Sequence, residues 1–538
     1  MPELLQDWVT LQASLHPDAP AVVGETDVLS YWRLERLSNQ IARSLRAHGC
    51  RRGDRVCLLM PKSPTAIACI VGIYKADCIY VPLDPTSPSP RLETMIGACG
   101  SRWILAGGPV APLLDQILDG ERTPGSMAVG WMEEEPILPV RPSDGFGLEE
   151  VLDQPPTALP SRSRSGDAAH ILFTSGSTGT PKGVVVTHGS VIRFVEWART
   201  YFGIGPSDRL SGHPPLHFDL SFLDIFGAFA SGARLCLVPH EINLLPHRLA
   251  EFIRARRLTQ WFSVPSVLTY MSRFEAVRPG DFPELKRLLW CGEVFPTPSL
   301  IDWMKRLPHV RFSNLYGPTE TTIASSCYTV PRCPEDPSSP IPIGAPCDGE
   351  ELLVLDESLR PVMPGVIGEL CIGGVGLSPG YWNDAGRTAD VFRDIDRGPG
   401  TTHRIYRTGD LAKRGEDGQI YLVGRADSQI KSRGHRIELG EIEGALHAVG
   451  SVRECAVVAI PTDGFEGSLI CCAYVQGPGA EATPVALRRA LSKTLPSYML
   501  PARWKALDRL PVNGTGKIDR RLLREKFERD APEADRHS

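Results

Sequence analysis

The 538-residue chain lacks the features that mark several specialised classes of protein. Its 14 cysteines form no C-x-x-C pair, and without an export signal they indicate reduced, mostly buried thiols. The most apolar stretch, AIACIVGIYKADCIYVPL, is interrupted by Lys75 and Asp77 and is too short to span a bilayer. The first residues, MPELLQDWVTLQ, carry acids and no long apolar core, so no secretory signal is expected.

A strongly basic surface is also missing. The net charge is −5, and no basic cluster is interleaved with aromatic residues, which argues against nucleic acid as the main partner. Together with the missing membrane span, this balance predicts a soluble, cytoplasmic protein that binds neither nucleic acid nor a membrane.

What is present is an ordinary globular composition, with 42% hydrophobic and 22% charged residues. A chain of this length is expected to divide into two or more domains. Early segments alternate helical patterns with short apolar strands, as in LSYWRLERLSNQIARSLRAHGC followed by DRVCLLM. This order predicts an α/β fold with largely parallel sheets. Residues 343–425 are rich in strands and Gly turns, which predicts a small β-barrel or sheet, and the remainder predicts a small α+β domain.

One loop suggests a ligand. Residues 171–189, ILFTSGSTGTPKGVVVTHG, combine hydroxyls, glycines and Lys182 between two apolar runs. Glycines let the backbone approach an anion, and N–H groups with hydroxyls can surround phosphate oxygens. The loop is not a Walker A motif, because Lys182 stands between Pro181 and Gly183 and no Ser or Thr follows it. An idle loop between strands is the alternative for this segment taken alone.

Three further turns carry polar groups. In NLYGPTETT (314–322), Tyr316 can stack on a flat ring, Thr319 can donate to phosphate and Glu320 can ligate Mg²⁺. Asp410 in YRTGD is suited to accept both hydroxyls of a ribose, and NGTGKID sets Lys517 on a Gly-rich turn. Each turn alone is a weak signal, for which an ordinary solvated turn is the alternative. Their combination and order favour a nucleotide site.

The motifs resemble those of the adenylation domains of nonribosomal peptide synthetases, within the acyl-adenylate-forming superfamily. The resemblance covers nearly the whole chain in the order of that family. The matching segments are LSYWRLERLSNQIA (29–42), YKADCIYVPLDP (74–85), LFTSGSTGTPKGV (172–184), HFDLS (217–221), NLYGPTE (314–320), GELCIGGVGLSPGYW (368–382), YRTGD (406–410), GRADSQIKSRGHRIELGEIE (424–443) and NGTGKIDR (513–520).

This resemblance implies an enzyme that joins a carboxylic acid to ATP, releases pyrophosphate and then passes the acyl group to a thiol. The implied cofactors are ATP and Mg²⁺. The loop residues implied to hold the β- and γ-phosphates are Thr174, Ser175, Gly176, Ser177, Thr178, Gly179, Thr180 and Lys182. The implied adenine and ribose contacts are Gly292, Glu293, Asn314, Tyr316, Gly317, Asp410 and Arg425.

The implied chemistry needs charge compensation, because a carboxylate attacks an anionic phosphorus. By resemblance, Thr319 touches the α-phosphate, Glu320 helps hold Mg²⁺, and Lys517 bridges the substrate carboxylate and the α-phosphate. The resemblance also divides the chain into a large core, residues 1–426, and a small mobile domain, residues 427–538, that carries Lys517. The implied hinge is Asp427.

The acceptor of the acyl group is expected to be a discrete peptidyl carrier protein. The chain shows no LGG-x-S phosphopantetheine site and no H-H-x-x-x-D-G condensation motif. Coenzyme A is the alternative acceptor, as in acyl-CoA synthetases of the same superfamily. Asp219 in HFDLS argues against that alternative, because an aspartate at this position pairs with the α-ammonium in the amino-acid-activating members. A buried carboxylate is costly unless a cation meets it, although a helix cap is the other role open to Asp219.

Family correspondence gives a substrate pocket that is apolar apart from its two charged members. Its residues are Asp219, Leu220, Leu223, Phe262, Leu289, Cys291, Leu315, Ile323, Ala324 and Lys517. The assignments near 262 and 289–291 lie between motifs, where a shift of one residue is open. Such a pocket disfavours polar side chains. The series resembles the pocket of free-standing enzymes that load L-proline onto a carrier protein, so L-proline is the expected substrate. Another small apolar or cyclic amino acid, such as pipecolate or valine, is the alternative.

Overall fold

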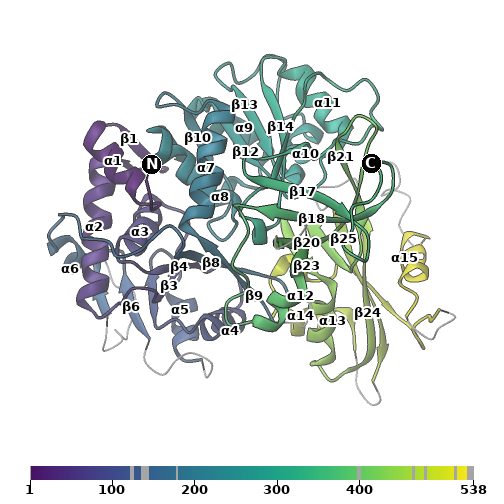
Figure 1. The fold of residues 1–538 in the computed structure, drawn as a ribbon. Helices are drawn as coiled ribbons and strands as arrows, with labels where there is room; N and C mark the ends of the chain where they lie inside the picture. The colour runs from purple at the N-terminus through teal and green to yellow at the C-terminus, as the bar shows by residue number, and fades with distance from the viewer. Residues whose placement is uncertain are drawn as a thin grey trace.

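Two large β-sheets with helices on both sides make up most of the molecule (Figure 1). The computed structural model describes residues 2–120, 127–134, 145–176, 180–396, 402–462, 467–477, 482–513 and 518–529. The predicted α/β fold with parallel sheets is confirmed, since most neighbouring strands of both large sheets are parallel.

The first large sheet has seven strands in the order β7-β6-β5-β3-β4-β8-β9, and only the β8–β9 pair is antiparallel. Its strands are β3 (Arg55–Leu59), β4 (Ile79–Pro82), β5 (Trp103–Ala106), β6 (Ala128–Trp131), β7 (Gly145–Gly147), β8 (Ala168–Thr174) and β9 (Lys182–Thr187). The Gly-rich loop therefore joins two adjacent strands, β8 and β9.

The second large sheet has nine strands in the order β16-β15-β14-β13-β12-β10-β11-β1-β2. Its strands are β1 (Pro20–Val23), β2 (Val28–Ser30), β10 (Arg209–Gly212), β11 (Arg234–Leu237), β12 (Gln260–Ser263), β13 (Arg287–Trp290), β14 (Arg311–Tyr316), β15 (Ser326–Thr329) and β16 (Ala345–Pro346). The central strands β1, β11, β10, β12, β13 and β14 are parallel, and the strands at the two edges are antiparallel.

Helices pack on both faces of each large sheet. One apolar core joins the facing sides of both sheets to the helices α1 (Asp7–Leu15), α2 (Tyr31–Ala47), α3 (Pro64–Lys75), α7 (His188–Phe202) and α8 (Leu220–Ser231). The outer faces are covered by α4 (Ser89–Cys99) and α5 (Ala111–Leu118) on the seven-stranded sheet, and by α9 (Pro246–Arg256), α10 (Pro265–Arg273) and α11 (Thr297–Arg306) on the nine-stranded sheet. Both large sheets are thus buried on two faces, as parallel sheets require.

The start signals of the early helices follow from their sequence. The hydroxyl of Ser30 accepts from the backbone N–H of Arg33 at the start of α2, and that of Ser63 accepts from Ala66 at the start of α3. Pro64 occupies the first turn of α3, where the missing N–H costs nothing. The predicted order of helix and strand over residues 29–85 is confirmed.

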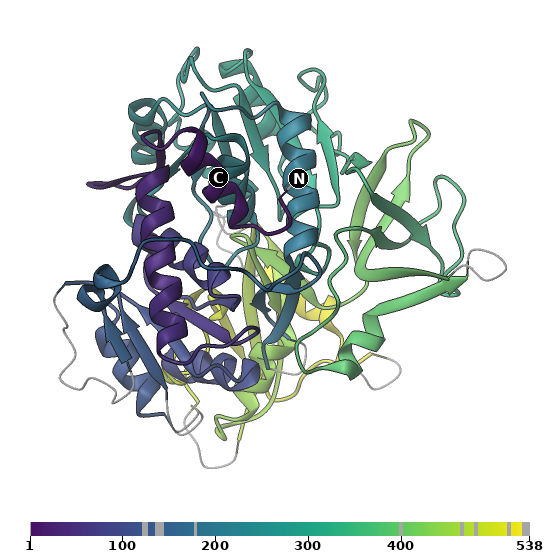
Figure 2. The same cartoon turned by 60° about the vertical axis from the view of Figure 1, so that its left-hand side comes forward.

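A smaller antiparallel sheet follows, which is drawn in green and lies to one side of the two large sheets in Figure 2. Its strands are β17 (Glu350–Leu355), β18 (Gly368–Gly374), β19 (Phe392–Asp396), β20 (Thr402–Arg414) and β21 (Ile420–Arg425). This sheet is the strand-rich unit predicted over 343–425, and it has an apolar core of its own that includes Leu370, Ile372 and Ala412.

The C-terminal unit begins with the hairpin of β22 (Gln429–Ser432) and β23 (His435–Glu438). It continues with α13 (Leu439–His447), β24 (Val452–Pro461), β25 (Ser468–Gln476), α14 (Pro484–Leu491), β26 (Arg503–Ala506) and α15 (Arg520–Arg529). Side chains of β24 alternate between two cores, so that α13, α14 and the hairpin cover one face of this sheet and α15 covers the other. The remaining helices are α6 (Leu148–Asp153), α12 (Ala385–Val391), η1 (His240–Ile242), η2 (Thr319–Thr321) and η3 (Ser497–Met499).

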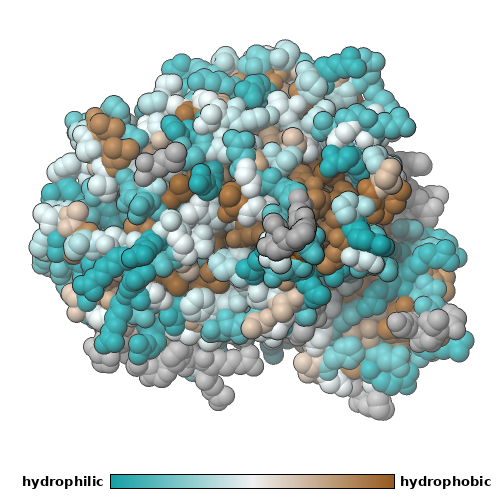
Figure 3. Space-filling view, viewed as in Figure 1, coloured by the Kyte–Doolittle hydropathy of each residue, from teal (hydrophilic) through white to brown (hydrophobic). Residues whose placement is uncertain are grey.

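The surface is mainly hydrophilic at its rim, and apolar side chains gather toward the middle of the face in Figure 3. None of the described helices is long and apolar enough to cross a membrane. All cysteines are unpaired and all but Cys333 are buried, as predicted.

Candidate active site

A cavity lies where the carboxyl ends of the parallel strands meet the C-terminal hairpin. Its lining includes Thr174 at the end of β8, Asp219 before α8, Thr319 in η2, Asp410 on β20 and Arg436 on β23. Parallel strands present their carboxyl ends at one edge, so the loops after several strands converge there. The structure thereby brings together four residues that the sequence predicted to act jointly and one, Arg436, that it did not.

Asp219 is a buried carboxylate at the head of α8, with 8% of its surface exposed. Asp219 is the N-cap residue of α8, but its side chain forms no capping hydrogen bond to that helix. Burial raises the pKa of Asp219 to about 6, and hydrogen bonding by Thr319 only partly offsets this rise. No ion pair joins Asp219 to a lysine or arginine in the part of the chain that the structure describes. A cation from outside would therefore stabilise this carboxylate.

Beside Asp219 lies an apolar wall of eight predicted residues that share one core, and two of them, Leu220 and Cys291, line the cavity. These residues are Leu220, Leu223, Phe262, Leu289, Cys291, Leu315, Ile323 and Ala324. In register, Phe262 on β12 is the partner of Leu289 on β13, whereas their neighbours Trp261 and Leu288 belong to the core on the other face of the sheet. A shift of one residue would move these positions to the other face of the sheet, so the predicted positions are those that face the core containing Leu220 and Cys291.

The apolar wall includes part of a strained turn at residues 322–323. Thr322 and Ile323 are β-branched and have positive φ of 61° and 69°, a conformation that such residues rarely adopt. The hydroxyl of Thr322 donates to the carbonyl oxygen of Gly376 at 2.7 Å, which helps hold the turn. At Gly317 a Cβ would lie 2.5 Å from Cα of Ala324, so only glycine permits this close approach.

The Gly-rich loop contributes hydroxyls to the cavity. Thr174 and Ser175 line it, and the buried Oγ1 of Thr174 has no hydrogen-bond partner. At Gly176 a Cβ would lie 2.1 Å from the carbonyl oxygen of Thr180, which explains this glycine. Ser177, Thr178 and Gly179, also predicted to bind phosphate, lie outside the described residues. An unused buried hydroxyl beside a tight glycine turn is suited to an anion's oxygen.

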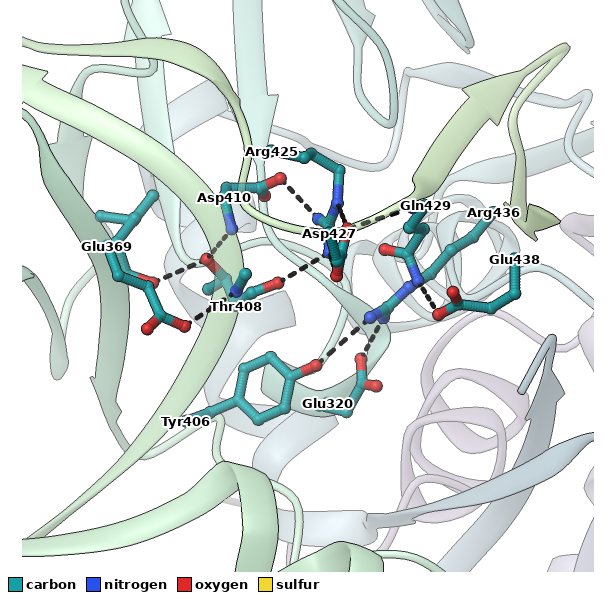
Figure 4. A network of polar contacts seen from close by, with 12 residues as sticks. Glu320, Glu369, Tyr406, Thr408, Asp410, Arg425, Asp427, Gln429, Arg436 and Glu438 are labelled. Atoms are coloured by element: carbon teal, nitrogen blue, oxygen red, sulfur yellow. Dashed lines mark hydrogen bonds and ion pairs between the residues drawn. The ribbon is translucent and has the colours of Figure 1, made fainter. Parts of the chain in front are cut away.

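On the other side of the cavity, Asp410 lies in a hydrogen-bonded cluster with Tyr316 and Arg425. The hydroxyl of Tyr316 donates to Oδ2 of Asp410 at 2.5 Å, and Nη1 of Arg425 lies 2.6 Å from Oδ1. Arg425 also contacts Asp427, just beyond the end of β21 (Figure 4). Each carboxylate oxygen keeps a further lone pair for a ligand hydroxyl.

The predicted adenine contacts are only partly brought to the cavity. Gly292 and Gly317 line it. The amide of Asn314 donates to the carbonyl oxygen of Pro342 at 2.9 Å, and Glu293 accepts from the N–H groups of Ser266 and Gly434. The ammonium of Lys431 lies 5.5 Å from the ring centre of Tyr316. In this arrangement Asn314 and Glu293 are therefore hydrogen-bonded to other protein groups, and Lys431 lies over the ring of Tyr316.

Glu320 is fully buried and surrounded by donors. Its Oε1 accepts from the hydroxyl of Tyr381 at 2.8 Å and lies 3.2 Å from Nζ of Lys182. Its Oε2 lies 2.7 Å from Nη1 of Arg436, a contact that Figure 4 shows. Burial opposes ionisation, but the Arg436 guanidinium and the Lys182 ammonium hold the pKa of Glu320 well below its usual range. Among the described residues, no group of three or more His, Cys, Asp or Glu side chains could hold a metal ion.

Lys517, predicted to be catalytic, lies outside the described residues. Its described neighbour Ile518 packs against the core that contains Leu523 and Phe527 of α15. Ile437 of the hairpin packs against the opposite face of the same sheet. The hairpin face of the C-terminal unit, rather than the face that Ile518 covers, is the one that meets the cavity.

Three contributors to this site were missed by sequence reasoning. Arg436 and Lys431 come from the segment GRADSQIKSRGHRIELGEIE, and Tyr381 comes from GLSPGYW. Both segments were recognised as motifs, but no local pattern shows that a hairpin reaches across to Glu320. A second contact across the same junction is the ion pair between Arg91 on α4 and Glu441 on α13. Arginines embedded in a Gly-containing hairpin were the only signal available.

Comparison with known proteins agrees with this geometry. Residues 9–382 match the family described as AMP-binding enzyme, and residues 441–517 match the AMP-binding enzyme C-terminal domain. A relative from Streptomyces coelicolor, named L-proline–L-prolyl-carrier protein ligase, is 38% identical over 94% of this chain and 94% of its own. A protein of the same name from Pseudomonas fluorescens is 33% identical over 98% of this chain and 100% of its own.

Solved structures give the same fold. The amide bond synthetase McbA from Marinactinospora thermotolerans superposes with a TM-score of 0.84 at 25% identity, over 97% of this chain and 99% of its own. The chain therefore belongs to the AMP-binding enzyme family. Enzymes of this family use ATP.

Proposed function

We propose that this enzyme activates L-proline with ATP as the aminoacyl-adenylate, releases pyrophosphate, and transfers the prolyl group to the phosphopantetheine thiol of a separate peptidyl carrier protein. The observation that carries the proposal is the buried carboxylate of Asp219, which forms no ion pair among the described residues and shares one cavity with Leu220 and Cys291 of the apolar wall and with Thr174 and Ser175 of the Gly-rich loop. An ammonium, a small apolar body and a phosphate would each find a matching surface there.

Asp219 recognises the amino group in this proposal. A secondary ammonium such as that of proline donates two hydrogen bonds, and its charge would lower the raised pKa of the carboxylate. The apolar wall then selects against polar side chains, because none of its eight members offers a hydrogen bond to one. The names of the two relatives from Streptomyces coelicolor and Pseudomonas fluorescens support proline over pipecolate or valine.

The phosphate end supplies the electrophilic groups. Thr174, Ser175 and the buried Lys182 would hold the leaving phosphates, with Thr319 beside the α-phosphate. The substrate carboxylate attacks phosphorus, and the bond to pyrophosphate breaks. Lys517 would offset the charge that develops between the two anions. Asp410 would accept the ribose hydroxyls, and Tyr316 would stack on adenine once Lys431 leaves its ring.

This account requires the C-terminal unit to move. We assign the boundary between a core of residues 1–426 and a domain of residues 427–538 to a hinge at Asp427. Asp427 lies between β21 and β22, and its carboxylate is held by Arg425 at 2.6 Å and 2.7 Å. In the present arrangement the hairpin meets the cavity, which suits the thiol-transfer step, and rotation at Asp427 would bring Lys517 to the reacting atoms.

Mg²⁺ is the metal that the family chemistry calls for, and Glu320 is its proposed ligand. The residues around Glu320 do not fit a metal in the present arrangement, because Arg436, Lys182 and Tyr381 already engage both oxygens of its carboxylate. A divalent cation at this point would stand against two positive side chains.

Amino-acid-dependent exchange of labelled pyrophosphate into ATP tests the proposal. A panel of the twenty amino acids plus pipecolate should show L-proline as clearly the best substrate. If another small amino acid leads, the proline assignment fails, and if no amino acid supports exchange, the adenylation proposal fails.

A variant separates catalysis from folding. Lys517→Ala should lower exchange by at least about 100-fold, since it removes the cation that offsets developing charge. Lys526→Ala on α15, which removes a lysine of the same unit, is the control and should leave exchange near the wild-type rate. A similar loss of thermal stability and activity in Lys517→Ala would indicate a structural lysine instead.

The acceptor is tested with preformed prolyl-adenylate. A phosphopantetheine-loaded carrier protein should accept the prolyl group far faster than free coenzyme A does. Equal rates with both thiols would favour the acyl-CoA synthetase type of ligase.

A further inference from the structure

The strained turn of the apolar wall is connected to the small antiparallel sheet. The hydroxyl of Thr322 donates to the carbonyl oxygen of Gly376 at 2.7 Å, and the N–H of Gly376 donates to Oε1 of Glu350 on β17 at 2.7 Å. A Cβ at Gly376 would lie 2.7 Å from that carboxylate oxygen and 2.7 Å from the carbonyl oxygen of Thr321, so the backbone here lies tightly between the turn and the strand. Two hydrogen bonds in series therefore join Glu350 to the turn.

This turn contributes two residues to the apolar wall, Ile323 and Ala324. The carbonyl oxygen of Ile323 lies 4.0 Å from Sγ of Cys291, which lines the cavity. Positive φ is costly for the β-branched Thr322 and Ile323, so the turn keeps this conformation only while surrounding contacts hold it. A weaker contact at Gly376 would let the turn relax and would shift Ile323 within the wall.

The carboxylate of Glu350 has no compensating charge. Within the described ranges no lysine or arginine pairs with it, and its buried Oε2 has no hydrogen-bond partner. Burial raises the pKa of Glu350 to about 7, and the hydrogen bond from Gly376 only partly offsets this rise. Two titratable side chains lie nearby, the exposed carboxylate of Asp348 and the thiol of Cys347, whose own pKa burial raises far above neutrality.

Protonation of Glu350 weakens its hold on the loop. A hydrogen bond to an ionised carboxylate is about twice as strong as a bond between neutral groups. As the pH falls through 7, Glu350 gains a proton and its bond from the N–H of Gly376 becomes a neutral one. The turn is then held less firmly.

We propose that Glu350 is a positioning residue for the choice of amino acid: through Gly376 it holds the turn of Thr322 and Ile323, and with it the shape of the apolar wall. This inference rests on the proposed function, because it assigns the wall to the side chain of the amino acid. The ionised carboxylate keeps the wall in its selective shape, whereas the protonated acid lets the turn relax and admits a larger ring. Glu350 thus controls selectivity rather than the rate of adenylation.

The ratio of kcat/KM for L-proline to kcat/KM for L-pipecolate, measured by pyrophosphate exchange, reports this selectivity. Both substrates carry a secondary ammonium, so protonation of Asp219 lowers both values and cancels in the ratio. In the wild type the ratio should fall at least about threefold between pH 8 and pH 6, with a midpoint near 7. Glu350→Gln should show the low ratio at both pH values. A wild-type ratio that does not change with pH would overturn the proposal, even if the variant failed to fold.

Glu351→Gln is the matched control. It removes the same charge from the next residue of β17, whose carboxylate lies 2.9 Å from Nε2 of His403 and faces the other side of the sheet. This variant should keep the wild-type ratio and its pH dependence. A change in the ratio equal to that of Glu350→Gln would show that the charge of the strand, and not the contact with Gly376, sets the selectivity.

Variants of Thr322 test whether the two contacts act in series. Thr322→Val removes the hydroxyl that donates to Gly376 and should lower the ratio as Glu350→Gln does, whereas Thr322→Ser retains the hydroxyl and should keep the wild-type ratio. The double variant Glu350→Gln, Thr322→Val should lower the ratio no further than either change alone. Additive losses would overturn the proposed series.

Hydrogen exchange of the peptide spanning residues 319–326 gives a readout that needs no substrate. At pH 8, this peptide should exchange several-fold faster in Glu350→Gln than in the wild type, and Glu351→Gln should leave it unchanged. Equal rates in Glu350→Gln and the wild type would overturn the proposal. Absence of pyrophosphate exchange with every amino acid would reject the proposed function, whereas an active Glu350→Gln with the wild-type preference at pH 8 would reject this inference alone.

Discussion

Asp219 and Glu320 are both buried carboxylates beside one cavity, but the first has mainly apolar neighbours and the second has cationic ones. Asp219 stands next to apolar side chains, and burial raises its pKa to about 6. Glu320 has two cations and a tyrosine hydroxyl as neighbours, and its pKa is held well below the usual range. The first carboxylate still needs a positive partner, whereas the chain itself provides partners for the second.

This difference separates a carboxylate suited to binding a ligand from one that holds the C-terminal hairpin against the core. A carboxylate left without a cation is a binding site for an ammonium, and the stabilisation appears only when the ligand arrives. A carboxylate that receives its cation from another part of the chain forms its ion pair only when that part is docked against it. The substrate pocket and the hairpin junction thus use the same chemical group for two different purposes.

The largest effect is expected from removing the charge of the recognition carboxylate. Asp219→Asn should lower kcat/KM for the amino acid by roughly 100- to 5,000-fold, because breaking a buried ion pair costs ~3–5 kcal/mol. The melting temperature at pH 8 should not fall, since the neutral amide removes the cost of a buried charge. Pyrophosphate exchange and thermal unfolding measure the two effects. Parallel loss of activity and stability would mean that Asp219 supports the fold.

The next largest effect is expected from pH. The pKa of Asp219 is raised to about 6, so the carboxylate gains a proton as the pH falls through 6 and can no longer pair with an ammonium. The KM for the amino acid should rise about tenfold between pH 8 and pH 5, because the ionised fraction of Asp219 falls from nearly one to roughly one eleventh over that range. Steady-state exchange across pH 5–8 measures this rise. The same slope in Asp219→Asn would assign the titration to another group.

A smaller effect is expected from enlarging the apolar wall. Phe262→Ala should shift relative kcat/KM by roughly tenfold toward bulkier side chains, because each methylene in such a pocket is worth ~1–3 kcal/mol. It should also lower the free energy of unfolding by ~3–5 kcal/mol, since Phe262 is fully buried. Trp261→Ala, one residue away on the other face of the sheet, is the control for stability loss alone. If both variants change substrate preference equally, the inward register of β12 is not what selects the substrate.

The smallest effect is expected at the hairpin junction. Tyr381→Phe removes one donor to Glu320 and leaves Arg436 and Lys182 in place. Loss of one hydrogen bond to a charged group costs ~1.5–3 kcal/mol, so hydrogen exchange of the peptide 429–438 should accelerate by roughly tenfold if docking depends on this network. No acceleration would show that Glu320 holds the hairpin without Tyr381.

The shared core of the residues proposed for the substrate pocket could be predicted from the sequence because their pattern is local. Phe262, Leu289 and Leu315 lie on neighbouring strands, where alternate residues face one side, and the motifs fix the register on either side of them. Asp219 could be predicted for the same reason, since a carboxylate between Phe218 and Leu220 at the start of an apolar helix has no ordinary surface role.

The hairpin junction could not be predicted in this way. Arg436 and Glu320 are separated by 116 residues, and nothing in either neighbourhood indicates which of the many possible partners each side chain meets. The state of Glu320 depends on how one unit is placed against another, which is a property of tertiary packing rather than of a motif. The sequence motifs pointed to Glu320 on the core and did not point to the guanidinium of Arg436 that meets it.

The proposal that Asp219 binds the ammonium group of the substrate is tested most directly with a substrate analogue that lacks this group. Tetrahydrofuran-2-carboxylate has the ring size and carboxylate of proline but an ether oxygen in place of the nitrogen. Pyrophosphate exchange with the wild-type enzyme should be rapid with L-proline and at least about 100-fold slower with this analogue, and Asp219→Asn should reduce that preference sharply. Comparable exchange with both acids in the wild type would contradict the assignment of Asp219 as the partner of the amino group.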